Sequence, residues 1–376
     1  MSEAKASRLP RPLTLFDQAL TVGVEEEFLL VDAVTRAVVP RAPAVLAAKT
    51  DFDLQAELTD FQVESATPVC RTMAEVRSEL VAARDVLAGL ASVHGARLVA
   101  TGTAVLGRVQ PAPLTDDPRY RRMEVEYGRL IHDLTICGCH VHVGIPDDDT
   151  GVLVSNHLRP WLPVLLALSA NSPFAAGSDT GYASWRYLSW SPWPSAGAPP
   201  WFASAEEYHR SRRLLQASGA AMDSATIYWD VRLSVAHPTV ELRVCDVAAT
   251  VDEAVLIAAL VRGIAATALG SRTPAVAVAP HLLRAALWRA ARDGVEGTNV
   301  DLVTGELVRG AELVQGLVRW VRPALEAAGD YELVTEGVDR VLMDGSGAER
   351  QRRAFRRRGE LSDVVDLLVE QTVRWG

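Results

Sequence analysis

The sequence is almost without lysine. Only two lysines, Lys5 and Lys49, occur among its 38 basic residues, and the others are arginines. A phosphate-binding P-loop requires a lysine directly after its second glycine, and the chain has no Gly-x-x-x-x-Gly-Lys-Ser/Thr string. Schiff-base chemistry is disfavoured as well, because Lys5 lies in a segment expected to fray and Lys49 lies among polar turn residues.

An excess of positive charge and a long apolar run are also lacking. The 38 basic residues are outnumbered by 47 acidic ones, and the formal net charge is −9, whereas a nucleic-acid partner requires a basic face. The longest apolar stretch, residues 254–269, is interrupted by Arg262. Because it is shorter than the roughly 18 apolar residues that suggest a membrane span, we predict a buried helix there and no membrane partner.

Cysteine is scarce. The four cysteines, Cys70, Cys137, Cys139 and Cys245, come with an N-terminal segment that lacks the apolar core of a signal peptide. We therefore expect a reducing, cytoplasmic location. Residues 1–15 are expected to be disordered or loosely packed.

The remaining sequence predicts one α+β domain covering residues 1–376. Short β-branched segments bounded by turn formers predict strands at 21–31, 59–65, 97–103, 134–145, 228–235 and 239–246. Apolar residues at helical spacing predict helices at 72–93, 152–170, 205–218, 252–269, 281–293, 306–328 and 361–374. The last two strands are joined by three residues and predict a hairpin, hence an antiparallel sheet with helices packed on one face.

Two of the predicted strands carry acids in alternation with apolar residues. In the first, Glu25 and Glu27 share one face and Glu26 lies on the other. In the second, Asp60 and Glu64 alternate with apolar residues in the same way. Carboxylates about 7 Å apart on one face can bind a hard cation. Solvated acids on an exposed edge strand are the alternative, and Glu26 is explained by neither interpretation.

A third strand combines cysteine with histidine. Cys137, Cys139, His140 and His142 suggest a zinc site, but alternation places the cysteines and the histidines on opposite faces, so the four cannot converge on one tetrahedral ion. The cysteines then serve as small buried hydrophobes. Each histidine is either a ligand on the polar face or a core histidine with a satisfied ring.

The fourth strand places Glu241 and Arg243 on one face. A cross-strand ion pair explains these two residues as well as a functional site does. The repetition over four strands favours a sheet with one carboxylate-rich face, which repels itself without cations. Oxygen ligands with an imidazole suit Mg²⁺ or Mn²⁺ better than zinc.

Six ordered motifs resemble those of the YbdK-like carboxylate-amine ligases of the glutamate–cysteine ligase type 2 family. They are TVGVEEEFLLVD, ELTDFQVESATPV, ICGCHVHVG, SANSPF, TGYASWRYLSWSPWPSAGAPPW and TVELRVCD. The match runs from about residue 20 to about residue 250, with a weaker echo near the C-terminus.

The resemblance implies a glutamine-synthetase-like catalytic sheet that binds ATP and two or three Mg²⁺ (or Mn²⁺) ions. At the matching positions, it implies that Arg186 and Arg243 bind phosphate groups or the substrate carboxylate. Alternation does not place Glu57 on the face of Glu64, so either a turn or bulge intervenes or the role that the resemblance implies for Glu57 is wrong. The metal ligands that the resemblance implies are Glu25, Glu27, Glu57, Glu64, His140 and Glu241.

The reaction that the resemblance implies begins with activation of the γ-carboxylate of glutamate as an acyl phosphate. Cysteine or another amine then attacks, and the sequence does not identify which amine. The resemblance also implies a homodimer. Two rivals stay open, namely a metal-dependent hydrolase that uses the same carboxylates and a degenerate nucleotide-binding subunit.

Two segments have no assigned role. Residues 177–201 carry four tryptophans without periodicity and predict a long ordered loop, which either covers the site or fills a core or dimer interface. Residues 350–358 carry six arginines. Such a cluster on an acidic chain is more typical of a solvated helix face, a subunit contact or a cover over ATP than of nucleic-acid binding.

Overall fold

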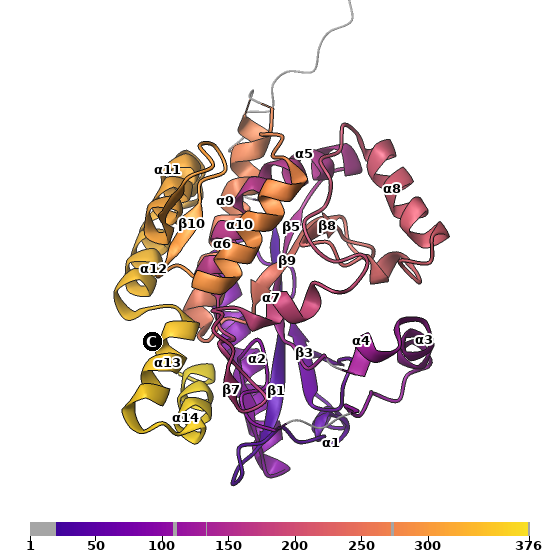
Figure 1. The fold of residues 1–376 in the computed structure, drawn as a ribbon, viewed down its shortest axis with the longest axis vertical. Helices are drawn as coiled ribbons and strands as arrows, with labels where there is room; N and C mark the ends of the chain where they lie inside the picture. The colour runs from indigo at the N-terminus through magenta and orange to yellow at the C-terminus, as the bar shows by residue number, and fades with distance from the viewer. Residues whose placement is uncertain (1–19, 108–110, 133, 272–273, 375–376) are drawn as a thin grey trace, which may run out of the picture.

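A seven-stranded antiparallel sheet forms the centre of the computed structural model, which describes residues 20–107, 111–132, 134–271 and 274–374 (Figure 1). The strand order is β2-β3-β1-β5-β9-β8, and β4 also pairs with β1. The expectation for residues 1–15 lies outside the described residues. The strands are β1 Val22–Asp32, β2 Asp53–Ala56, β3 Gln62–Ala66, β4 Ala96–Val99, β5 Gly138–Gly144, β8 Val231–Leu233 and β9 Thr239–Asp246. The predicted antiparallel α+β architecture is confirmed.

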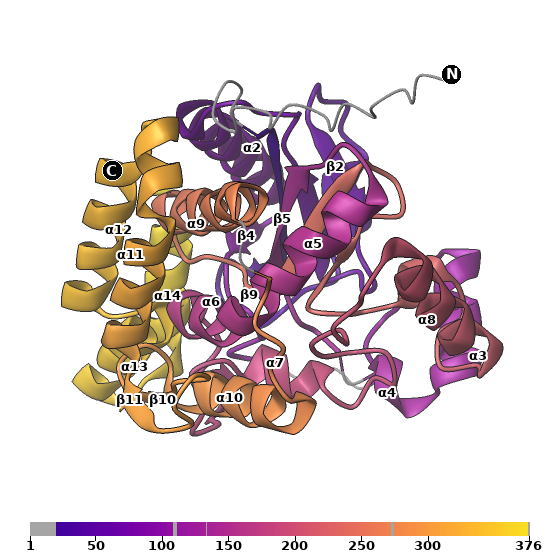
Figure 2. The same ribbon diagram turned by 90° about the horizontal axis from the view of Figure 1, so that it is seen from above.

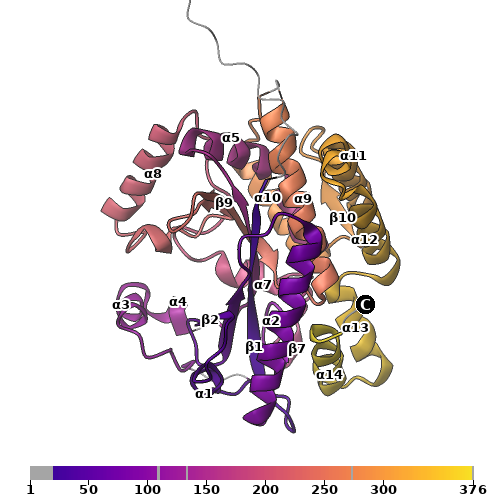
Figure 3. The same ribbon diagram turned by 180° about the vertical axis from the view of Figure 1, so that it is seen from behind.

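Helices cover one face of this sheet, which we call the back face. The helices α2, α5, α6 and α9 pack on it, as α14 does beside β4, and α11 to α13 lie outside them, whereas α3, α4 and α8 lie on the other side (Figures 2 and 3). The helices are α1 Ala42–Leu46, α2 Met73–Val93, α3 Pro118–Tyr127, α4 Arg129–His132, α5 Asp148–Leu158, α6 Leu162–Ser169, α7 Trp185–Trp190, α8 Ala205–Ala217, α9 Val251–Gly270, α10 Pro280–Asp293, α11 Gly310–Ala328, α12 Tyr331–Asp344, α13 Gly347–Arg358 and α14 Leu361–Thr372. Two short hairpins lie outside the main sheet, β6 Phe174–Ala175 with β7 Ser178–Asp179 and β10 Thr298–Val300 with β11 Leu307–Arg309.

The helix α9 is the apolar segment that the sequence singles out. Thr250 and Glu253 form a capping box at its start, which satisfies backbone N–H groups of the first turn. Its length and composition would suit a membrane span, but 72% of its apolar window is buried inside the protein. Arg262, which interrupts the apolar stretch 254–269, forms a buried ion pair with Asp330. The prediction of a buried helix is therefore confirmed.

Alternation along the strands separates the two faces of the sheet as predicted. In β5, Cys139, Val141 and Val143 belong to the apolar core on the back face. A bulge interrupts the β5–β9 ladder, since Cys139 pairs with Cys245 but Val141 pairs with Leu242. The extra residue of β9 lies opposite His140 and locally increases the twist at this point.

Several helical predictions needed correction. The predicted helix 152–170 is divided into α5, a 3₁₀ turn Arg159–Trp161 and α6, because Pro160 and Pro163 cannot donate the helical hydrogen bonds. The predicted loop 177–201 contains the short helix α7. The sequence reasoning did not predict α3, α12 and α13, whose apolar positions are sparse or interrupted by charge.

Candidate active site

A cavity of about 450 Å³ opens on the face of the sheet opposite the back face. Its floor consists of side chains from β1, β3, β5 and β9 that alternate with the buried back-face residues. All the predicted site residues lie around this one cavity. The lining includes Glu25, Glu27, Glu57, Glu64, His140, His142, Arg186, Glu241 and Arg243.

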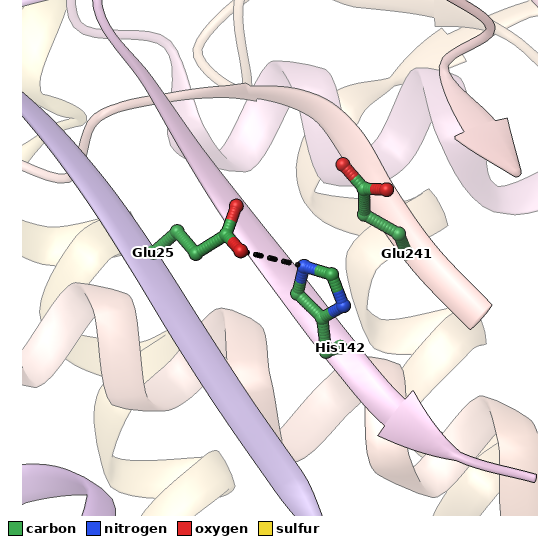
Figure 4. Close-up of side chains that lie close together, drawn as sticks. All are labelled: Glu25, His142 and Glu241. Atoms are coloured by element: carbon green, nitrogen blue, oxygen red, sulfur yellow. Dashed lines mark ion pairs between the residues drawn. The ribbon is translucent and has the colours of Figure 1, made fainter. Parts of the chain in front are cut away.

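One cluster of possible metal ligands joins three neighbouring strands. Glu25 in β1, His142 in β5 and Glu241 in β9 each place a ligand atom within 4.8 Å of the others (Figure 4). The Nε2 atom of His142 lies 3.1 Å from Oε1 of Glu25, a spacing close to the about 3 Å that separates adjacent ligand atoms around an octahedral ion. The other ring nitrogen, Nδ1, lies 2.8 Å from Oγ1 of Thr239, and such a contact fixes the orientation of a metal-binding ring.

A second cluster lies beside the first and contains carboxylates alone. Glu27, Glu57 and Glu64 again place oxygen atoms within 4.8 Å of one another. Glu27 and Glu64 are directly opposite in the β1–β3 ladder. Glu57 follows the last residue of β2, so the turn before β3 brings it to this face. This turn supplies the irregularity that strand alternation required for Glu57.

His140 lies between the two clusters. Its Nδ1 atom is 3.1 Å from Oε2 of Glu25, and its Nε2 atom is 3.7 Å from Oε1 of Glu27. The resemblance assigns metal binding to His140, whereas the structure places His142 in the three-strand cluster. Strand alternation predicts both rings on this face, but it does not show which of the two binds a metal.

Burial and mutual repulsion make the second cluster costly without a counter-charge. Burial raises the pKa of Glu64 well above its usual value, and the neighbouring carboxylates of Glu57 and Glu25 raise it further. Burial also raises the pKa of Glu27 against the attraction of His140. A cation bound between these carboxylates would offset both the burial and the repulsion.

The histidines fit the same conclusion. Burial lowers the pKa of His140, so its ring is neutral at pH 7, as a metal ligand must be. The Nε2 atoms of His140 and His142 are buried and make no hydrogen bond of good geometry. Buried polar atoms without partners are rare. The donor set of carboxylates and imidazole nitrogens fits Mg²⁺ or Mn²⁺.

Arginines hold the last predicted acid in its charged form. Arg243 and Arg232 both form ion pairs with Glu241, and the Nε atom of Arg232 lies 2.8 Å from its Oε2. Burial opposes ionisation, yet the charges of Arg243 and Arg232 hold the pKa of Glu241 well below its usual value. Arg232 was not predicted from the sequence, and the observed β8–β9 register places it directly opposite Glu241.

Arg186 reaches the site from outside the sheet. It lies in the first turn of α7, is 6% exposed, and donates to the main-chain oxygens of Val244 and Arg243 at 3.4 and 3.3 Å. Asp246 anchors this helix, since it accepts hydrogen bonds from Ser184 and Ser172 at 2.8 and 2.7 Å. Sequence reasoning missed this buried anchor at the end of β9.

An aromatic wall, which we define as Tyr120, Trp190, Trp193 and Tyr228, closes another side of the cavity. The ring centroids of Trp190 and Tyr228 are 4.5 Å apart, and those of Trp190 and Trp193 are 5.4 Å apart. Two of the four tryptophans of segment 177–201 thus line the cavity. Trp185 and Trp201 are not among its lining residues.

The arginine cluster of α13 lies away from the residues that line this cavity. Most of its members are paired within the chain: Arg350 with Glu253, Arg352 with Asp179, Arg356 with Glu349 and Arg358 with Asp363. The paired charges support the interpretation as a helix face rather than a nucleic-acid surface.

The fold is glutamine-synthetase-like, as the sequence resemblance implied. It is similar to the glutamate–cysteine ligase of Francisella tularensis solved in complex with AMP, with a TM-score of 0.70 and 13% identity over 95% of this chain and 90% of that one. A bifunctional glutathione synthetase from Pasteurella multocida gives a TM-score of 0.69 and 17% identity, covering 96% of this chain and 52% of that one. At these identities the likeness concerns the fold.

The sequence comparisons define the family. Residues 21–367 match the glutamate–cysteine ligase family 2 profile, and the chain belongs to this family. A protein of Saccharopolyspora erythraea with the provisional name glutamate–cysteine ligase 2-1 is 48% identical over 94% of this chain and 95% of its own length. A relative from Mycolicibacterium vanbaalenii, provisionally named glutamate–cysteine ligase 2-2, is 50% identical over 92% of this chain and 96% of its own length.

Proposed function

We propose that the protein is an ATP-dependent carboxylate-amine ligase that activates the γ-carboxylate of glutamate and joins it to an amine, with cysteine as one candidate acceptor. The observation that carries the proposal is the pair of ligand clusters, Glu25–His142–Glu241 and Glu27–Glu57–Glu64, side by side on one sheet face. Family membership and a neighbour of similar fold solved with AMP support the use of ATP.

The reaction would proceed in two displacements. An oxygen of the substrate γ-carboxylate attacks the γ-phosphorus of ATP, the bond to the β-phosphate oxygen breaks, and ADP leaves. The nitrogen of the amine then attacks the carbonyl carbon of the acyl phosphate, inorganic phosphate leaves, and the ammonium nitrogen loses its proton. No covalent protein nucleophile is needed, because phosphoryl transfer depends mainly on positioning and charge neutralisation.

The residues of the site would divide these tasks. The two clusters and His140 would hold divalent cations, which supply charge neutralisation to the polyphosphate. Arg186 and Arg243 would donate hydrogen bonds to phosphoryl or carboxylate oxygens, as the planar guanidinium does well. The aromatic wall would restrict water, which otherwise hydrolyses an acyl phosphate.

We also propose the partners, the oligomeric state and the location of the enzyme. Its partners would be small-molecule substrates, and it would work as a homodimer in the cytoplasm without binding nucleic acid or membranes. The family resemblance supports the homodimer, and the acidic net charge supports the absence of a nucleic-acid partner.

The test combines purified protein, ATP, Mg²⁺, glutamate and a panel of amines, with ADP release and product mass as the two readouts. We expect amine-dependent ADP release and a γ-glutamyl product, both lost in the Glu241→Gln variant. Substrate hydrolysis without nucleotide would favour the hydrolase. Magnesium-dependent ATP binding without turnover under any combination would favour a nucleotide-binding subunit.

A further inference from the structure

Glu26 separates the two metal-face acids of β1 and is itself buried on the back face of the sheet. Glu26 and Arg84, which lies in α2, are each 0% exposed. The pair is bidentate, with Arg84 Nε 2.9 Å from Oε2 and Nη2 2.6 Å from Oε1 of Glu26. The contact therefore fixes a residue whose two chain neighbours, Glu25 and Glu27, belong to the two ligand clusters.

Arg84 connects this strand with two other parts of the chain. Its Nη2 atom donates to the carbonyl oxygen of Ala248 at 2.9 Å, and its Nη1 atom donates to those of Ala249 and Thr372 at 3.4 and 3.3 Å. With the two bonds to Glu26, all five N–H groups of the guanidinium are used. Ala248 and Ala249 follow β9, the strand of Glu241, with only Val247 between them and its last residue.

Stability alone is a poor reason for such a pair. Removing two charges from water is costly, and a well-packed apolar pair of similar volume is often equally or more stable. A buried guanidinium fork nevertheless sets distances and angles that apolar packing does not. The pair therefore contributes more to the geometry of the sheet than to the free energy of unfolding.

The geometry that it can set is the spacing of β1 relative to β9. Regular β5–β9 pairing does not continue through this part of the sheet, because a bulge between Cys139 and Val141 interrupts it. Glu26 pairs with Cys139, and Cys139 pairs with Cys245, in the row just before the bulge. Arg84 spans β1 and the residues after β9 at this level of the sheet.

We propose that Glu26 and Arg84 are positioning residues, which hold β1 and the end of β9 at the spacing that lets Glu25 and Glu241 bind one cation with His142. The inference rests on the proposed function, since it presupposes that this cluster binds a divalent cation. Glu26 acts through its neighbours and touches neither substrate nor metal.

The test measures Mn²⁺ binding to the full-length protein without nucleotide, by the electron paramagnetic resonance signal of free Mn²⁺. We expect Glu26→Gln to weaken Mn²⁺ binding by about 10-fold or more, the range seen when a residue that supports a metal ligand is lost. The control is Asp330→Asn, which disrupts the buried pair with Arg262 in another part of the core. It should lower the unfolding temperature and leave the Mn²⁺ affinity unchanged.

The outcomes separate the two proposals. If the unaltered protein binds no Mn²⁺, the metal platform of the proposed function fails. If it binds Mn²⁺ and a folded Glu26→Gln variant binds equally well, only the positioning role is overturned. Should Glu26→Gln fail to fold, Arg84→Lys keeps the charge without the fork, and unchanged Mn²⁺ affinity there overturns the role. If neither variant folds while Asp330→Asn does, the pair is purely structural and the positioning role is overturned.

Discussion

The guanidinium of Arg186 occupies the space that a side chain at position 138 would need. A Cβ atom built on Gly138 would lie 2.2 Å from Nη2 of Arg186 and 2.8 Å from its Cζ. The backbone N–H of the same glycine donates to Oε2 of Glu27 at 2.6 Å. One residue of β5 thus admits the arginine and orients a carboxylate of the second cluster.

This contact predicts a large effect of a single methyl group. Gly138→Ala should displace Arg186 and lower turnover by about 10²-fold or more, the usual loss when a donor to developing charge is removed. The backbone at Gly138 is not left-handed, so the fold should persist. Steady-state ADP release and circular dichroism check both statements.

Gly89→Ala provides the control for this variant. No atom lies within 4 Å of a Cβ built at Gly89 in α2, and alanine favours the helix by about 0.5–1 kcal/mol over glycine. We expect unchanged turnover and a slightly higher unfolding temperature. Normal turnover in Gly138→Ala would show that Arg186 is not needed where the structure places it.

The two histidines should differ in how they affect metal stoichiometry. His142→Ala removes a member of the Glu25–His142–Glu241 cluster, so titration with Mn²⁺ should show one ion fewer. His140→Ala leaves the ligand atoms of both clusters in place and should weaken binding without changing the stoichiometry. The reverse pattern would assign the ligand to His140, as the family resemblance does.

Metal binding should become stronger as the pH rises. The pKa values of Glu64 and Glu27 are raised in the folded protein. Without metal, their protonation therefore stabilises the folded state fully below the ordinary glutamate pKa of about 4.3, and this stabilisation is lost as the pH rises. A cation replaces those protons. We expect Mg²⁺ to raise the unfolding temperature more at pH 8 than at pH 5.5.

Proton release provides a second measurement of the same linkage. Calorimetric titration with Mg²⁺ in buffers of different ionisation enthalpy should show protons leaving the protein on binding. The depressed pKa values of Glu25 and Glu241 act in a different window, since their stabilisation is lost only in acid below about pH 4.3. Stabilisation by Mg²⁺ that is independent of pH between 5.5 and 8 would contradict the assignment.

Asp230 should destabilise the folded protein at neutral pH. Burial raises the pKa of its carboxyl to about 7, although Tyr187 Oη lies 3.3 Å from Oδ2. Protonation of Asp230 therefore stabilises the folded state fully below the unfolded pKa of about 3.9, and this stabilisation is lost as the pH rises to about 7.

The matched variant is Asp230→Asn, which keeps the shape and cannot ionise. It should be more stable than the unaltered protein by about 2–4 kcal/mol at pH 8, and the difference should disappear near pH 4. Urea unfolding at the two pH values measures it. Equal stabilities at pH 8 would show that the folded protein accommodates the charged carboxylate.

The sequence by itself determined which side chains share a face of the sheet. Period-two alternation is a local property of an extended backbone, and it correctly placed Glu25 with Glu27, His140 with His142, and Glu241 with Arg243 on the cavity side. The hairpin of β8 and β9 was predictable for the same reason, because its two strands are separated by a short turn.

Only the tertiary structure decided which distant residues meet on those faces. A turn places Glu57 beside Glu64, and the hydrogen bonds of Asp246 hold the helix of Arg186 against the sheet. Arg84 from α2 forms an ion pair with Glu26. These partners are separated by as many as 74 positions in the chain, and local periodicity carries no information over such distances. Packing selects them, because a buried charge is tolerated only where the fold supplies its counter-charge.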